Sequence, residues 1–154
     1  MKTAYIALIG RINRVSQDLE KVVSRAKSLM DKAQRTGDDG YLDGVALNLH
    51  GFYAGVERIF EDVARTLERD VPRGPGWHHD LLLQMAAEID AIRPPVIKAE
   101  TRNCLDEYRG FRHVVRNVYT FNLQLPRLQE LTKKLSDCFG LVKRDLDDFM
   151  GFIV

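Results

Sequence analysis

The sequence of 154 residues contains no long apolar segment, few cysteines and almost no excess of charge of either sign. An apolar stretch near the N-terminus is interrupted by Arg11 and Arg14, far short of the ~18 apolar residues that a membrane span needs. No small-residue cleavage site follows this stretch, so we expect neither a secretory signal nor a membrane anchor. The expectation is a cytoplasmic protein with no membrane association.

The near balance of positive and negative charge and the scarcity of cysteine exclude further classes of function. Lys and Arg number 23 and Asp and Glu number 22, a formal net charge of +1, so any attraction to a nucleic acid must come from a local patch. Cys104 and Cys138 are too few for a disulfide framework and lack the spacing of metal ligands, which favours a reducing compartment. Both lie on apolar faces of predicted helices, where we expect them to pack as small hydrophobic residues.

Apolar residues recur every three or four positions over most of the chain, a pattern typical of amphipathic α-helices. The first stripe, over 8–29, predicts a long helix that stops at the segment 36–40, which holds two glycines. A second stripe, over 42–63, predicts a helix that ends near Arg69. Two long helices joined by a short turn form a hairpin, which needs further helices to bury its apolar stripes.

Prolines and glycines delimit three more predicted helices. The segment 71–76 holds two of each and predicts a turn, a short helix is expected over 77–89, and 93–95 ends it with two prolines. A fourth helix is expected from Ala99, with an apolar face made of Cys104, Tyr108, Phe111, Val115 and Val118. Pro126 suits the first turn of a fifth helix, whose stripe consists of Leu128, Leu131, Leu135, Cys138, Val142 and Phe149.

No segment of useful length alternates between apolar and polar residues as a half-buried strand does. The predicted fold class is therefore all-α: an up-and-down bundle of four to five helices that forms a single domain over 1–154. Gly110 lies inside the fourth predicted helix and costs up to ~1 kcal/mol relative to alanine. Its presence predicts the close approach of a neighbouring helix or of a second subunit.

The most unusual local composition lies between Glu107 and Glu130. The 22 residues between them contain no Asp or Glu and carry a formal charge of +4, which leaves −3 for the rest of the chain. At about 100° per residue, four basic side chains share an arc of about 100° opposite the apolar face of the fourth helix. These residues are Arg109, Arg112, His113 and Arg116.

Two interpretations of this basic arc remain open. The arginines can cover apolar surface with their stems, or pair with acids elsewhere such as Asp145, Asp147 and Asp148. Alternatively they form a phosphate site, because guanidinium groups hold phosphate oxygens in a bidentate fork and a nearby imidazole can transfer a proton. Such groups are the parts of a metal-free ribonuclease, in which a base deprotonates the 2′-hydroxyl that attacks the adjacent phosphate. DNA lacks that hydroxyl, so RNA is the expected substrate.

Other polar residues carry weaker signals. Adjacent histidines in 78–80 (His-His-Asp) point about 100° apart on a helix, and no further ligand follows to complete a metal site. His50 lies among apolar residues, where a satisfied, partly buried histidine is expected. The sequence has no nucleophile elbow and no phosphate-cradling glycine loop, and we expect neither a metal nor another cofactor.

The segment RHVVRNVY at 112–119, preceded by LDEYRGF at 105–111, resembles the motif helix of HEPN domains in the HepT-like toxin group. The segments LNLHGFY at 47–53 and WHHDLL at 77–82 add to the likeness, which covers roughly 40–131. The resemblance implies a helical homodimer whose motif helices face each other across a cleft that binds RNA. It further implies a metal-independent endoribonuclease, the toxin of a toxin-antitoxin pair, neutralised by a minimal nucleotidyltransferase.

The family motif R-x-x-x-x-H-x-Y places Arg112 at the Arg position and Tyr119 at the Tyr position, which the resemblance implies is the target of AMP transfer by the antitoxin. The His position holds Asn117, which cannot act as a base near neutral pH. Either His113 supplies the imidazole, or Arg and Asn support weaker catalysis, or the protein binds RNA without cutting it.

The expected roles follow from the motif and the basic arc. Arg112 holds the scissile phosphate, His113 acts as base or acid, and Asn117 orients the substrate. Arg109 and Arg116 bind the flanking phosphates. The alternative is a catalytically inactive helical module that binds a partner nucleotidyltransferase.

Overall fold

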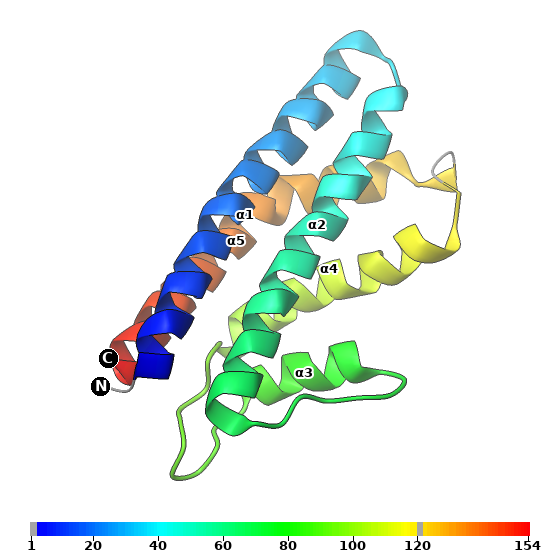
Figure 1. Ribbon diagram of the computed structural model, residues 1–154. Helices are drawn as coiled ribbons and strands as arrows, with labels where there is room; N and C mark the ends of the chain where they lie inside the picture. Colours follow the sequence, from blue (N-terminus) through cyan, green and yellow to red (C-terminus); the bar gives the residue numbers. More distant parts are fainter. Residues whose placement is uncertain (1–2, 120–121) are drawn as a thin grey trace.

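The computed structural model describes residues 3–119 and 122–154, and helices dominate both ranges. Figure 1 shows five α-helices in chain order: α1 (Thr3–Thr36), α2 (Gly40–Val63), α3 (Trp77–Ala86), α4 (Ala99–Asn117) and α5 (Leu125–Ile153). A π-helical turn, η1 (Ala64–Glu68), extends α2 until Arg69 takes a left-handed conformation. No strand occurs among the residues described, where Ile89 and Arg93 form an isolated bridge. The predicted all-α bundle is confirmed.

The helices α1 and α2 form the expected antiparallel hairpin, with α4 and α5 packed against it (Figure 1). Gly37 has a φ of 70° and its N–H donates to the Ala33 carbonyl at 3.0 Å, which ends α1 as the glycines predicted. The last turn of α5 lies beside the first turn of α1. Within the described ranges, no helix has both the length and the apolar character needed to cross a membrane.

A neighbouring helix approaches closely at Gly55 of α2, but none does so at Gly110 of α4. A Cβ at Gly55 would lie 2.6 Å from Leu19 Cδ2 of α1, so the missing side chain makes room for that leucine. A Cβ at Gly110 would meet no atom within 4 Å. The prediction that a neighbouring helix of the same chain packs on Gly110 is therefore wrong, and its alternative, a subunit contact, stays a prediction.

The central position of α2 explains why it is buried over most of its circumference. Phe52 contacts Tyr108 of α4 and Phe139 of α5 edge to face, with ring centroids 5.2 and 6.1 Å apart. Each such pair contributes about 0.5–1.5 kcal/mol beyond the area it buries. A polar side chain on the inward side of α2 therefore lies in the core, and Tyr53 and Glu57 are two examples, only 0% and 5% exposed.

The helix α3 ends at Ala86, three residues before the predicted end at Ile89. The following segment turns back, and the buried guanidinium of Arg93 donates to the carbonyls of Gln84 and Ala87 at 2.9 and 2.7 Å. The same side chain pairs with Glu68 of η1 at 2.7 Å. Arg93 thus satisfies carbonyls at the end of α3, which a stripe of apolar residues could not predict.

The two cysteines are joined. Cys104 of α4 and Cys138 of α5 form a disulfide, with Cα atoms 5.9 Å apart, a normal separation for the bond. The expectation that both act only as small hydrophobic residues is wrong, because packing of the two helices brings their stripes to the same level. With the thiols bonded, the argument for a reducing compartment from free cysteines no longer holds.

Candidate functional site

The C-terminal half of α4 presents its basic residues on one side of the helix, as predicted. Arg109 and Arg112 are partly buried, whereas His113, Arg116 and Asn117 are exposed. We call these five residues the basic face.

The opposite side of α4 packs into the core. Tyr108 and Phe111 are 1% and 3% exposed, and the Tyr108 hydroxyl donates to the Leu131 carbonyl of α5 at 2.7 Å. Val115 packs against the core in part. The prediction for Val118 is wrong, because α4 ends at Asn117 and Val118, in an extended conformation, is 40% exposed.

The members of the basic face differ in how they are neutralised. Arg109 Nε pairs with Asp106 Oδ1 one turn earlier at 2.7 Å, and Arg127 of α5 lies 3.6–3.7 Å from Glu130 and Glu107. Arg112 and Arg116 form no ion pair with any residue in the described ranges. The acids considered as partners in the sequence are elsewhere, since Asp145 and Asp148 bind Lys98 instead.

His113 and Asn117 are linked on the exposed side of α4. The Asn117 amide nitrogen donates to the His113 carbonyl at 2.7 Å and lies 3.3 Å from His113 Nδ1. The amide nitrogen can donate to Nδ1 when that ring nitrogen carries no proton. Tyr119 follows the helix end and is 73% exposed.

His50 is a residue of this site that the sequence analysis did not select. It lies on α2, half-buried, and burial lowers its pKa, as do the positive charges of Arg112 and Arg116. The expected partial burial is confirmed, and no hydrogen bond joins its ring to another described residue. A neutral imidazole therefore lies within electrostatic reach of the two arginines that lack ion pairs.

A second imidazole is bound to a buried carboxylate next to the basic face. His78 Nδ1 lies 2.7 Å from Glu57 Oε2, joining the start of α3 to α2. Burial raises the pKa of Glu57 overall, although the hydrogen bond to His78 and the charges of His78 and Arg112 oppose this. The Trp77 ring stacks beside the His78 ring, with centroids 3.7 Å apart.

Tyr53 lies between His50 and Glu57 along α2. Its buried hydroxyl has no hydrogen-bond partner among the described residues, and burial raises the pKa of this phenol. His50, Tyr53 and Glu57 are three and four positions apart, so they share one side of α2. Three polar residues spaced three and four positions apart in an otherwise apolar helix are the sequence signal that could have revealed this group.

The metal interpretation of 78–80 gains no support from the geometry. His78 is bound to Glu57, and within the described ranges no three His, Cys, Asp or Glu side chains gather as metal ligands would.

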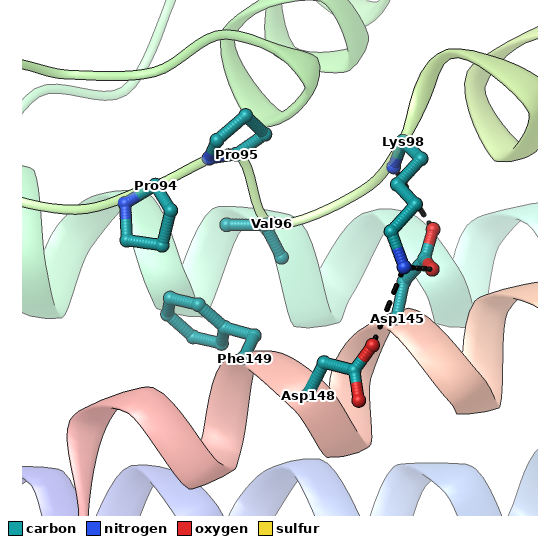
Figure 2. Close-up of a pocket in the computed structure, with 7 residues that line it drawn as sticks. All are labelled: Pro94, Pro95, Val96, Lys98, Asp145, Asp148 and Phe149. Carbon is teal, nitrogen blue, oxygen red and sulfur yellow. Dashed lines mark hydrogen bonds and ion pairs between the residues drawn. The ribbon is translucent and has the colours of Figure 1, made fainter.

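A cavity of about 270 Å³ elsewhere in the molecule has a structural role (Figure 2). Pro94, Pro95, Val96 and Phe149 form its apolar wall, with Lys98, Asp145 and Asp148 at its edge.

The polar groups at that edge bind one another. Asp145 Oδ2 accepts hydrogen bonds from the Lys98 N–H at 2.9 Å and from the Thr101 hydroxyl at 2.6 Å. Burial alone would raise the pKa of Asp145, but these two hydrogen bonds and the charges of Lys98 and Arg144 lower it. The carboxylate thus anchors the first turn of α4.

Comparison with known proteins gives one informative match. A family model described as HepT-like protein matches residues 44–153, which include α2 to α5 apart from the first turn of α2. The match contains both the basic face and the Glu57–His78 pair. No curated protein and no solved structure matches the chain.

Proposed function

Because this chain belongs to the HepT-like family, a group of HEPN-type helical proteins, we propose that it is a metal-independent endoribonuclease, the toxin of a toxin-antitoxin pair. One observation carries the proposal: Arg112 and Arg116 have no ion pair in the described ranges and lie near a neutral, half-buried imidazole, that of His50. Unpaired guanidinium groups bind phosphate in bidentate fashion and stabilise the charge that develops on it.

Each residue of the basic face has a role in this proposal. Arg112 holds the scissile phosphate, while Arg109 and Arg116 bind flanking phosphates. His113 supplies a proton-transfer group in place of the family histidine, and Asn117 orients it and the substrate. The Asn117 amide nitrogen lies 3.3 Å from His113 Nδ1, which supports this division of labour.

A second copy of the chain is the proposed partner that completes the RNA cleft. Val114, on the same half of α4 as the arginines, is 42% exposed, and Val118, directly after the helix, is 40% exposed. Gly110 has open space above it. Apolar exposure beside a basic face fits a homodimer in which two α4 helices border the bound RNA.

The proposed antitoxin is a minimal nucleotidyltransferase that transfers AMP to Tyr119. The exposure of this side chain, 73%, supports access by an enzyme. An AMP group adds negative charge three residues from Arg116 and competes with RNA for the arginines. We also propose a cytoplasmic location, where RNA and such a partner are found.

A catalytically inactive module that binds the nucleotidyltransferase is the second candidate, favoured by Asn117 at the family histidine position. The two candidates differ in one assay, in which purified protein is incubated with total RNA in the presence of a metal chelator. The enzyme cleaves the RNA, and Arg112→Ala abolishes cleavage with helicity unchanged. Arg25→Ala, which removes an exposed arginine of α1, is the matched control and cleaves at the normal rate.

Nucleotidyltransferase binding without cleavage, even after Asn117→His, would establish the inactive module instead. Equal cleavage by the wild type and by Arg112→Ala and His113→Ala would show that the basic face does not carry the activity. AMP transfer is followed by the mass of the intact chain, with Tyr119→Phe as the variant that stays unlabelled.

A further inference from the structure

Cleavage of RNA through its 2′-hydroxyl needs two proton transfers, one from that hydroxyl and one to the departing 5′-oxygen. His113 is suited to the second, because it is the exposed imidazole of the basic face and a protonated imidazole can deliver a proton. Asn117 itself accepts no proton near neutral pH. With His113 as the proton donor, the basic face itself has no proton acceptor, if the proposed function holds. The neighbouring imidazoles are those of His50 and His78, and of these two His78 is hydrogen-bonded to a carboxylate.

The Glu57–His78 pair has the geometry of an acceptor. The His78 Nδ1–H donates to Glu57 Oε2 at 2.7 Å, which leaves the lone pair of the neutral ring on Nε2. The carboxylate holds the ring in this tautomer, and the stacked Trp77 ring limits its rotation. An imidazole oriented by a carboxylate is the recurring arrangement of catalytic bases in proteins.

The pair joins the protein core to its surface. The side chain of Glu57 is 7% exposed, and that of His78 is 20% exposed, so the imidazole reaches solvent while its partner does not. The charges that act on Glu57 are His78, Arg112 of α4 and Glu61 of α2. The carboxylate thus lies within electrostatic reach of the guanidinium that holds the scissile phosphate in the proposed function.

A purely structural tie explains the pair less well. A buried carboxylate bound to an imidazole contributes little net stability compared with apolar residues of the same shape, because the carboxylate loses its hydration. Glu57 lies on the apolar central helix, where leucine or methionine would pack without that cost. The presence of a carboxylate at this position is explained by its hydrogen bond to His78, which orients the imidazole.

We propose that His78 is the catalytic proton acceptor of this site and that Glu57 is its positioning residue. His78 Nε2 takes the proton of the 2′-hydroxyl as the 2′-oxygen bonds to phosphorus. The bond from phosphorus to the 5′-oxygen breaks, and that oxygen receives a proton from the protonated ring of His113, which becomes neutral. The products are a 2′,3′-cyclic phosphate and a free 5′-hydroxyl. His78 then releases its proton to water and His113 takes one up, which restores both rings.

The test measures cleavage of a fluorogenic oligoribonucleotide by the full chain between pH 5 and pH 9. His78→Ala lowers kcat about 10²- to 10⁴-fold, the usual effect of losing a general base. Glu57→Gln keeps a hydrogen-bonding oxygen but removes the charge, so it should lower kcat less than His78→Ala does. It should also move the acid limb of the pH profile, which would not happen if the pair had only a structural role. His79→Ala, the neighbouring exposed histidine, is the matched control and leaves kcat unchanged.

Binding of a 2′-O-methyl oligonucleotide, which cannot be cleaved, separates catalysis from recognition. His78→Ala binds this probe like the wild type, whereas Arg112→Ala binds it weakly. Wild-type kcat and pH profile in both His78→Ala and Glu57→Gln overturn the role of the pair and leave the ribonuclease proposal standing. A wild-type protein that cleaves no RNA overturns the ribonuclease proposal, and the role of His78 falls with it.

Discussion

The two halves of α4 differ in what holds them. In the first half, Asp145 anchors the N-terminal turn, the disulfide joins Cys104 to α5, and the Tyr108 hydroxyl binds the Leu131 carbonyl. In the second half, Arg112 and Arg116 have no ion pair in the described ranges, and Val114 is 42% exposed.

This contrast teaches how one helix serves both stability and recognition. The anchored half fixes the direction of α4 against α2 and α5, so the basic face projects from a rigid support. A binding surface on such a support loses less entropy when it binds its ligand. The unpaired charges and exposed valines are tolerated because the buried contacts lie one or two turns earlier.

Removing the disulfide is expected to have the largest effect on stability. Cys104 and Cys138 are separated by 34 residues, and a cross-link closing a loop of this length stabilises a protein by about 3–4 kcal/mol. The double variant Cys104→Ala/Cys138→Ala, and the wild type in reductant, should both lose stability in urea unfolding. Reductant should leave the double variant unchanged, and a wild-type curve that does not respond to reductant would contradict the bond.

Removing the carboxylate anchor of the first turn should have a smaller, pH-dependent effect. Asp145→Asn weakens two hydrogen bonds to a charged acceptor, each contributing about 1.5–3 kcal/mol. The pKa of Asp145 is below its ordinary 3.8 in the folded chain, so its stabilisation is present above that value and is lost as the pH falls through the folded pKa.

The stability difference between the wild type and Asp145→Asn should therefore be full at pH 7 and shrink in acid. Thermal unfolding at pH 7 and pH 3 measures it. Asp148→Asn is the matched control, because within the described residues the only ion pair of this exposed carboxylate is with Lys98. Its loss should lower the stability by less than about 1 kcal/mol. An equal loss at both pH values would show that the charge of Asp145 does not act as an anchor.

The sequence predicted the helices well because apolar periodicity reports burial directly. All six residues of the predicted stripe of α5 are buried, as is every predicted position of α2 except Leu42, which is partly buried. The end of α3 was placed three residues late because a distant side chain, Arg93, decides where its carbonyls find donors. Such a long-range contact leaves no periodic signal.

The candidate site was predicted in part for the same reason. The residues of the basic face lie on one helix, so the regular rotation of about 100° per residue was enough to predict that they share one side. The Glu57–His78 pair and His50 come from other helices, and only packing brings them near Arg112. The disulfide was missed because a separation of 34 residues says nothing about which helix faces pack together.

The smallest expected effect concerns Gly110, at the boundary between the two halves. A Cβ there meets no atom within 4 Å, so Gly110→Ala should stabilise an isolated chain by about 0.5–1 kcal/mol through better helix propensity. If a second copy packs its α4 on this glycine, the added methyl group pushes the two helices apart and weakens the dimer. If the protein dimerises through this glycine, Gly110→Ala should therefore raise the unfolding stability measured at low protein concentration. It should lower the fraction of dimer measured by sedimentation at high concentration. A variant that is more stable and equally associated would place the subunit contact away from Gly110.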